Sequence, residues 1–187
     1  MCNVTEALIK YRSFIGILCL VVVLWLATPD VWSISVGFFF MMIGMFFRAW
    51  SSGYINKDKE LATEGPYSLT RNPLYFGNLL LGAGIAIASH NWLTVAICAV
   101  YYISFFTFLI AIERKRMKSR FGPRYEDWAK QANLFFPRIK KIENFNFNIA
   151  FYMKNREYRV LFYSLFIIAV LVIKFLRKIG FIGFIGK

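Results

Sequence analysis

The stretch that decides the fold runs from Leu74 to Ile112 and reads LYFGNLLLGAGIAIASHNWLTVAICAVYYISFFTFLIAI. It contains no Asp, Glu, Lys or Arg. A membrane-spanning helix needs about 20 mostly apolar residues, so the stretch has room for two. Its polar centre, Ser89-His90-Asn91, is typical of a turn between them. Because a helix satisfies its own backbone hydrogen bonds, it is the favoured way to cross lipid. The stretch therefore predicts a helical hairpin in a bilayer.

Similar apolar segments lie on both sides of this hairpin. An earlier pair is joined at Thr28-Pro29-Asp30, which predicts a second hairpin. A final apolar segment is followed by basic residues, so it either spans or lies along the membrane surface. The predicted spans are residues 14–28, 31–49, 73–89, 91–112 and, on the first of these two interpretations, 160–176.

Composition supports one membrane domain over the whole chain. Hydrophobic residues make up 58% of the 187 positions, and the mean hydropathy is +0.52, both high for a soluble domain. No alternation of strands and helices points to a soluble nucleotide-binding domain. We therefore expect an all-α, polytopic membrane helix bundle with four to five transmembrane helices.

The basic residues predict how the bundle is oriented. The two turns at 28–30 and 89–91 contain no Lys or Arg, whereas the segments 48–72 and 113–159 are rich in them. The N-terminal flank contributes Lys10 and Arg12, and two of the loops contribute Lys57, Lys59, Lys140 and Lys141. The positive-inside rule then places the N-terminus and both basic segments in the cytoplasm. If 160–176 spans, the basic residues after it lie outside, against the rule.

The formal net charge of +13 also bears on the kind of partner. Much of the excess follows the fourth predicted span directly, where anionic lipid headgroups can neutralise it. We find no recognisable nucleic-acid-binding module, so a lipid bilayer is the expected partner and nucleic acid is not. Cys2, Cys19 and Cys98 lack the spacing of metal ligands, and His90 has no second ligand nearby. No metal site is expected.

A first polar segment, residues 60–78, contains Glu64-Gly65-Pro66-Tyr67-Ser68-Leu69-Thr70-Arg71-Asn72-Pro73-Leu74-Tyr75-Phe76-Gly77-Asn78. Gly65-Pro66 predicts a turn. Asn72 is a favoured N-cap and Pro73 suits the first helical position, so part of the motif only starts a helix. An arginine beside free helix N–H groups can bind a carboxylate or phosphate. That interpretation makes Arg71, with Tyr67, Tyr75 and Asn78 nearby, a candidate binding site.

A second polar segment, residues 113–138, opens where the fourth span is expected to end. Glu113 lies at that boundary, and it is either a solvated acid among bases or a functional one. Phe121-Gly122-Pro123 predicts a break in the chain. Tyr125–Ala132 then predicts a short amphipathic helix.

Together these elements carry a resemblance. The pattern G-P-Y-x-x-x-R-N-P-x-Y-x-G, an apolar hairpin, E-x-x-x-x-x-x-x-F-G-x-x-Y and a final Pro resembles the isoprenylcysteine carboxyl methyltransferase and phospholipid N-methyltransferase type of integral membrane enzyme. The similarity covers about residues 60–138. It implies methyl transfer from S-adenosylmethionine to a lipophilic acceptor, a carboxylate or amine of a prenylated or phospholipid-like molecule, at the cytoplasmic face.

The resemblance also implies roles for particular residues. Arg71 would hold the carboxylate of S-adenosylmethionine, and Glu113 its ammonium or ribose hydroxyls; both are expected to be essential for catalysis. Tyrosines would line the ring and the sulfonium. The residues expected to bind the cofactor are Gly65, Tyr67, Arg71, Asn72, Pro73, Tyr75, Gly77, Asn78, Glu113 and Tyr125.

Two departures and two alternatives accompany this expectation. Many relatives have histidine at the position of Asn72, and many have a second glutamate where this chain has Arg114. An NADPH-dependent membrane reductase of sterol-like substrates is one alternative, and a non-enzymatic scaffold is the other. Small residues in the third predicted span favour close helix packing in any of these cases; they are Gly77, Gly82, Gly84, Ala86 and Ala88.

Overall fold

The structure is a computed structural model that describes residues 2–56, 60–138 and 147–181, without the side chains of residues 2–10 and 12. Six of the basic residues used to predict orientation fall outside this description, wholly or by their side chains: Lys10, Arg12, Lys57, Lys59, Lys140 and Lys141. The helices are α1 (Cys2–Leu26), α2 (Val31–Ser52), α3 (Pro66–Leu69), α4 (Pro73–Ala88), α5 (Trp92–Gln131), α6 (Ile149–Lys154) and α7 (Tyr158–Lys178). The described part of the chain contains no strand, which confirms the all-α prediction.

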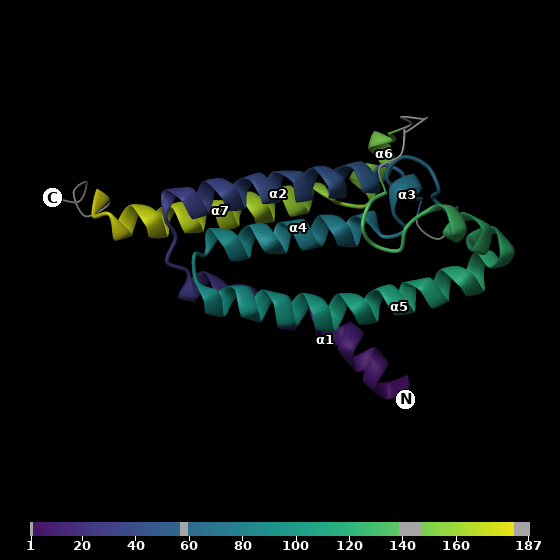
Figure 1. The fold of residues 1–187 in the computed structure, drawn as a ribbon, viewed down its shortest axis with the longest axis horizontal. Coiled ribbons are helices and arrows are strands. Elements are labelled where there is room, and N and C mark those ends of the chain that lie inside the picture. Colours follow the sequence, from purple (N-terminus) through teal and green to yellow (C-terminus); the bar gives the residue numbers. More distant parts are fainter. Residues whose placement is uncertain (1, 57–59, 139–146, 182–187) are drawn as a thin grey trace.

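The long helices run along one common axis in two groups. Figure 1 shows α2, α4 and α7 side by side, with α1 and α5 below them. The two groups meet where α4 contacts α5 and where α1 contacts α7. One end of the bundle carries the two tight turns, and the other carries α3, α6 and the bent end of α5 (Figure 1). Any site built from the two polar segments therefore lies at this second end.

Three of the helices, α2, α5 and α7, are long and apolar enough to cross a membrane. Two more apolar stretches, Ser13–Leu26 and Pro73–Ala88, are shorter; the 16 residues of α4 rise only about 24 Å. Helix α7 lies beside α2, parallel to the bundle axis (Figure 1). This is the arrangement that the spanning interpretation of 160–176 requires.

Both predicted hairpin turns are present, and hydrogen bonds join them. The backbone N–H of Thr28 donates to the carbonyl of Ser89 at 2.8 Å, and the Asn91 side-chain amide donates to the carbonyl of Leu26 at 3.1 Å. Asp30 caps α2 by accepting the backbone N–H of Ser33 at 2.7 Å, which lowers the pKa of Asp30 below its usual value. Because the turns meet at one end, the last part of α2 meets the first part of α4 at the other.

Glycines allow α2 and α4 to pack at close range. A Cβ added at Gly37 would lie 2.5 Å from the carbonyl oxygen of Gly84, and one at Gly44 would lie 2.7 Å from that of Gly77. Neither position has room for a side chain, as in small-residue contacts between membrane helices. The predicted close packing is therefore confirmed at Gly77 and Gly84. Gly82 instead faces the ring of Tyr102 on α5.

The basic end of α7 lies against the α1–α2 turn. The Lys174 ammonium donates to the carbonyls of Leu24 and Trp25, each at 2.8 Å. Lys178 reaches the carbonyls of Thr28 and Pro29 at 3.4 Å each. The last carbonyls of a helix lack partners within the helix, so Lys174 satisfies two groups that α1 would leave unpaired, and Lys178 reaches two more in the turn that follows. The basic tail of α7 thus has a local structural role at the end opposite the polar segments.

Helix α5 does not end at Glu113, contrary to expectation. It continues through the charged residues to Gln131, and its one non-helical residue is Gly122, with φ of +49°. Lys, Arg and Met are good helix formers, so nothing stops the helix until the Gly122-Pro123 pair bends it. Lys118 and Glu126 join the two sides of the bend at 2.7 Å. The break lies at Gly122, where Phe121-Gly122-Pro123 predicted it, and the helix that follows, up to Gln131, includes most of the predicted Tyr125–Ala132 helix.

Candidate functional site

The two polar segments meet through backbone hydrogen bonds. Thr70 and Asn133 form an isolated parallel bridge, in which the N–H of Arg71 donates to the carbonyl of Asn133 at 2.8 Å. The Thr70 hydroxyl donates to the carbonyl of Phe135, also at 2.8 Å. Residues 133–138 therefore lie over the start of α4 and fix the backbone of Arg71.

Asn72 takes part in this contact in an unexpected way. It occupies the N-cap position of α4, with Pro73 first in the helix as predicted, but its side chain makes no capping hydrogen bond. The side-chain amide donates instead to the carbonyl of Leu134 at 2.8 Å. The predicted side-chain cap is wrong, because the returning chain offers the amide a backbone carbonyl as acceptor. Asn72 thus joins the two segments.

The turn at Gly65 brings Tyr67 into the interior. Gly65 has φ of +55°, and a Cβ there would lie 2.5 Å from the Tyr54 ring, so glycine is required on both counts. Trp128 donates its indole N–H to the carbonyl of Tyr67 at 3.2 Å. Tyr125 is buried and packs edge-on against Trp128, with ring centres 5.6 Å apart. The helix after the bend of α5 thus covers α3.

Two buried polar atoms at this end lack a hydrogen-bond partner within the described structure, the hydroxyl of Tyr67 and Nε of Arg71. Burial raises the pKa of Tyr67 well above its usual value, and the charges of Glu157 and Glu113 raise it further. Glu113 is half-buried, and it forms no ion pair with any residue that the structure describes. A buried donor without a partner is costly. The group formed by Tyr67, Arg71 and Glu113, which we call the motif cluster, is therefore incomplete by itself.

The last residues of the first motif contact α2 and α5. Gly77 lies under the side chain of Arg48: a Cβ there would be 2.7 Å from Arg48 Cγ. Asn78 accepts a hydrogen bond from Arg48 Nη1 through its side-chain oxygen. Tyr75 packs edge-on against Phe106 of α5, with ring centres 5.5 Å apart. Of the ten predicted cofactor residues, Gly77 therefore has an evident packing role.

Sequence reasoning missed the two residues that hold Asn78 in place. Arg48 is paired with Glu157, which lies 109 positions further along the chain, with Nη2 2.7 Å from Oε2. The side chains are only 14% and 11% exposed. A charge interrupting an apolar segment could have marked Arg48. Nothing in the sequence pattern pairs it with Glu157.

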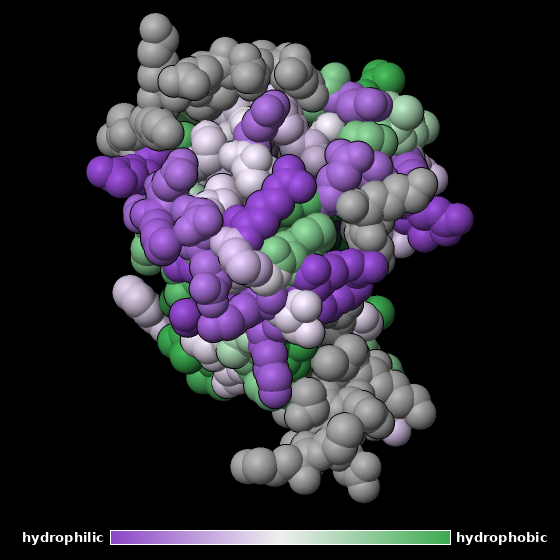
Figure 2. All heavy atoms as spheres, turned by 90° about the vertical axis from the view of Figure 1, so that its right-hand side faces the viewer, coloured by the Kyte–Doolittle hydropathy of each residue, from purple (hydrophilic) through white to green (hydrophobic). Residues whose placement is uncertain are grey.

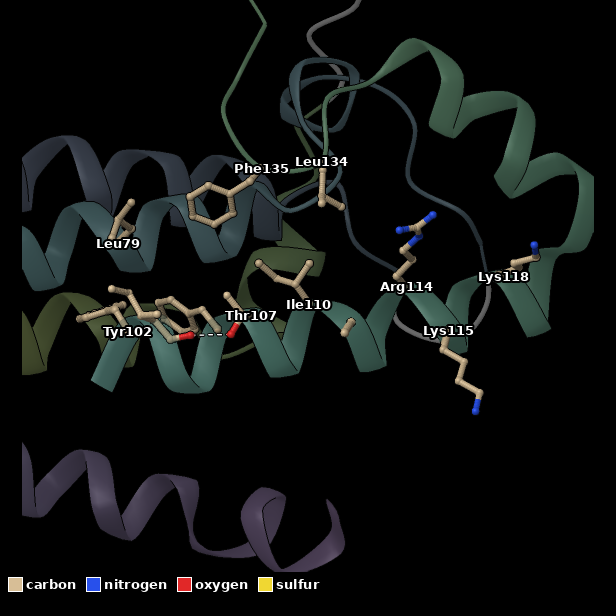
Figure 3. A pocket seen from close by; sticks show the side chains of 12 residues that line it. Leu79, Tyr102, Thr107, Ile110, Arg114, Lys115, Lys118, Leu134 and Phe135 are labelled. Carbon is tan, nitrogen blue, oxygen red and sulfur yellow. Dashed lines mark hydrogen bonds between the residues drawn. The ribbon is translucent and has the colours of Figure 1, made fainter. Parts of the chain in front are cut away.

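A groove of about 700 Å³ opens beside this cluster, between α4 and α5 (Figure 3). On α5, the lining residues recur every three or four positions from Tyr102 to Lys118, over about 24 Å of helix. The lining residues are Leu79, Tyr102, Ile103, Phe106, Thr107, Ile110, Ala111, Arg114, Lys115, Lys118, Leu134 and Phe135. The groove is apolar along most of its length and basic at its outer end.

The groove and the motif cluster share a wall. The carbonyl of Leu134 accepts a hydrogen bond from the side chain of Asn72, and that of Phe135 accepts one from the side chain of Thr70. Leu134 and Phe135 also line the groove (Figure 3). Figure 2 views this end of the molecule and shows hydrophilic residues gathered around a narrow hydrophobic strip. A polar ligand in the cluster and an apolar one in the groove would therefore be neighbours.

Comparison with known proteins supports the family resemblance. The family model described as phospholipid methyltransferase matches residues 11–124. A cobalt-zinc-cadmium resistance protein of Cupriavidus metallidurans is 34% identical over 94 residues, which are 49% of this chain and 43% of that protein. A nickel-cobalt-cadmium resistance protein of Alcaligenes xylosoxydans xylosoxydans is 32% identical over 108 residues, 57% of this chain and 50% of that protein.

A third relative has an enzymatic name, protein-S-isoprenylcysteine O-methyltransferase of Schizosaccharomyces pombe. It is 30% identical over 84 residues, 45% of this chain and 36% of that protein. The chain thus matches half or less of the length of each of these relatives. No solved structure matches it significantly. The family match includes α2, α4 and α5 up to the bend, and leaves α6 and α7 outside.

Proposed function

The chain belongs to the phospholipid methyltransferase family, and from that premise we propose that it transfers a methyl group from S-adenosylmethionine to a lipophilic acceptor at the membrane surface. One observation carries the proposal. Buried polar atoms of Tyr67 and Arg71 lack partners within the described structure, in a cluster that shares a wall with an apolar groove. The cluster suits a polar cofactor and the groove suits a lipid tail.

The cluster fits the groups that S-adenosylmethionine presents. The Arg71 guanidinium would hold the carboxylate, since arginine pairs well with carboxylates. Glu113 would accept the ammonium or the ribose hydroxyls, and the rings of Tyr67, Tyr75 and Tyr125 would face the purine and the cation. When bound, the cofactor would supply an electrophilic methyl group on a positively charged sulfur.

The role of the protein side chains is then to bind, orient and exclude water. A tyrosine is protonated near neutral pH, and burial raises the pKa of Tyr67 further, so its hydroxyl would serve as a hydrogen-bond donor and not as a base. Trp128 and Tyr125 cover α3, which shields the cluster from bulk water. Methyl transfer depends mainly on alignment and a dry site, and these residues supply both.

The groove is suited to the acceptor. Its outer edge is formed by exposed residues of α5, among them Ile103 and Thr107, so it is open along a helix that would face lipid. Each methylene buried there contributes about 0.8 kcal/mol. Arg114 and Lys118 lie at the end where the basic segments gather. By the positive-inside rule this end is cytoplasmic.

Calorimetric titration of the purified protein with S-adenosylmethionine and, separately, with NADPH tests the proposal. Arg71→Ala and Glu113→Ala should each weaken S-adenosylmethionine binding by roughly 30- to 1,000-fold, about 2–4 kcal/mol. Arg124→Ala and Glu60→Ala remove exposed charges of the same kinds and serve as matched controls, which should bind normally. Binding of NADPH alone, or unchanged binding in both site variants, would contradict the proposal.

A further inference from the structure

Glu157 is the N-cap residue of α7, the one long helix among the described residues that lies outside the family match, yet it is directed into the candidate site. It immediately precedes α7 and accepts from Arg48 through both oxygens, with Nη2 2.9 Å from Oε1 and Nε 3.1 Å from Oε2. Arg48 belongs to α2, within the matched residues. The pair therefore joins a helix outside the family match to one within it.

Through Arg48 the contact reaches the first motif. The aliphatic part of Arg48 crosses Gly77, where a side chain would collide with it. Its Nη1 group donates to Asn78. Two neighbouring positions of the motif are thus shaped to receive one arginine. Because the guanidinium has a planar, fixed set of donors, the carboxylate of Glu157 determines where the donor to Asn78 points.

From this geometry we infer that Glu157 is a positioning residue for the cofactor site, acting through Arg48 on Asn78 and the start of α4. The inference rests on the proposed function. Glu157 would also neutralise Arg48, which leaves Arg71 as the cation able to bind the cofactor carboxylate. Glu157 affects Tyr67 as well, since its charge raises the pKa of the buried Tyr67 hydroxyl more than that of Glu113 does.

The alternative is that the pair only docks α7 against α2, and matched variants separate the two roles. Glu157→Gln removes the charge at the site. Leu171→Ala removes buried side-chain volume from α7 further along the same helix, where Leu171 is 1% exposed. Both variants should lower the melting temperature. Only Glu157→Gln should raise the Kd for S-adenosylmethionine, by about tenfold or more, as misplacement of binding groups does.

A double variant makes the distinction sharper. Replacing both charges, Arg48→Met with Glu157→Met, avoids leaving one buried ion unpaired and should restore much of the melting temperature. If Glu157 positions the site, S-adenosylmethionine binding stays weak although stability returns. If the pair only docks α7, binding recovers together with stability, and the inference is wrong. Glu157→Asp, which keeps the charge, should fold and bind between wild type and Glu157→Gln.

The outcomes also separate this inference from the proposed function on which it rests. Wild-type protein that binds S-adenosylmethionine, with Glu157→Gln and Leu171→Ala both binding like it, would overturn the inference alone. Equal weakening in those two variants would do the same. Wild-type protein that binds no S-adenosylmethionine would overturn the proposed function, and the inference with it. Titration of the full chain in detergent, with thermal unfolding measured in parallel, supplies every readout.

Discussion

The hydroxyl of Tyr67 is buried without a hydrogen-bond partner in the described structure, which costs stability unless a ligand completes it. Tyr67→Phe removes that hydroxyl and keeps the ring. We expect the melting temperature to stay level or rise, while the Kd for S-adenosylmethionine rises about fivefold to tenfold, the worth of one hydrogen bond. Tyr163→Phe, at an exposed position, is the control. Unchanged binding in Tyr67→Phe would remove the hydroxyl from the site.

The same residue predicts a dependence of stability on alkaline pH. Burial raises the pKa of Tyr67 in the folded protein above that of the unfolded chain. A tyrosine ionises near pH 10 when unfolded, so its neutral form favours the fold below that pH, and the advantage is lost as pH rises further. Wild-type protein should therefore lose more thermal stability than Tyr67→Phe between about pH 9 and pH 11. Parallel melting curves of the two proteins would contradict this.

The sequence predicted which residues lie together only where those residues are close along the chain. Arg71, Asn72 and Pro73 adjoin one another, so the motif alone grouped them. The contact from Asn72 to Leu134 needed the return of residues 133–138, whose position the sequence pattern did not give. The pair of Arg48 with Glu157 lies 109 positions apart, and no periodicity links residues on α2 and α7.

At the scale of helices, the α2–α4 contact tolerates little change. A Cβ at Gly37 would meet the backbone of Gly84, and backbone cannot move aside as a flexible side chain can. Gly37→Leu should therefore separate the helices and destabilise the protein by about 1–3 kcal/mol or more. Val36→Leu, at the neighbouring exposed position, should leave the melting temperature unchanged. A Gly37→Leu protein as stable as wild type would show that the helices do not pack this closely.

Helix boundaries were predictable where the chemistry of a single residue favours the start of a helix. Asp30 at the start of α2 and Pro73 at the start of α4 both lie where they were expected. The end of α5 was misjudged because the change from apolar to charged residues marks a change of solvent, which a helix can cross. Only Gly122, with its positive φ, changes the backbone direction.

At the scale of the whole molecule, orientation in the membrane is the first question. Thr28 and His90 belong to joined turns at one end, while α3, which contains Ser68, and the bent end of α5, which ends at Gln131, lie at the other (Figure 1). With the native cysteines removed, single cysteines are placed at these four positions. In intact cells, a membrane-impermeant thiol reagent should label one pair of positions and not the other. We expect labelling at Thr28 and His90 only. Labelling at Ser68 and Gln131 would reverse the proposed orientation.

The groove predicts how the acceptor is chosen. An acceptor with an acyl or prenyl tail gains the burial of that tail between α4 and α5, and its headgroup analogue does not. With labelled cofactor and matched subsaturating concentrations, methyl transfer should favour the tailed acceptor strongly. Equal turnover of the two compounds would show that the groove has no part in acceptor binding. The sequence predicted a lipophilic acceptor from its family resemblance, whereas the groove itself required the three-dimensional arrangement.

The two anchors of α7 have a consequence for how the protein is made. Glu157 holds one end of that helix to α2, and Lys174 holds the other to the end of α1. Because α7 is synthesised after every helix it touches, Arg48 lacks this carboxylate until synthesis reaches Glu157. Chains that end before Glu157 should therefore have a lower melting temperature than the full chain, since α7 and both of its anchors are then missing.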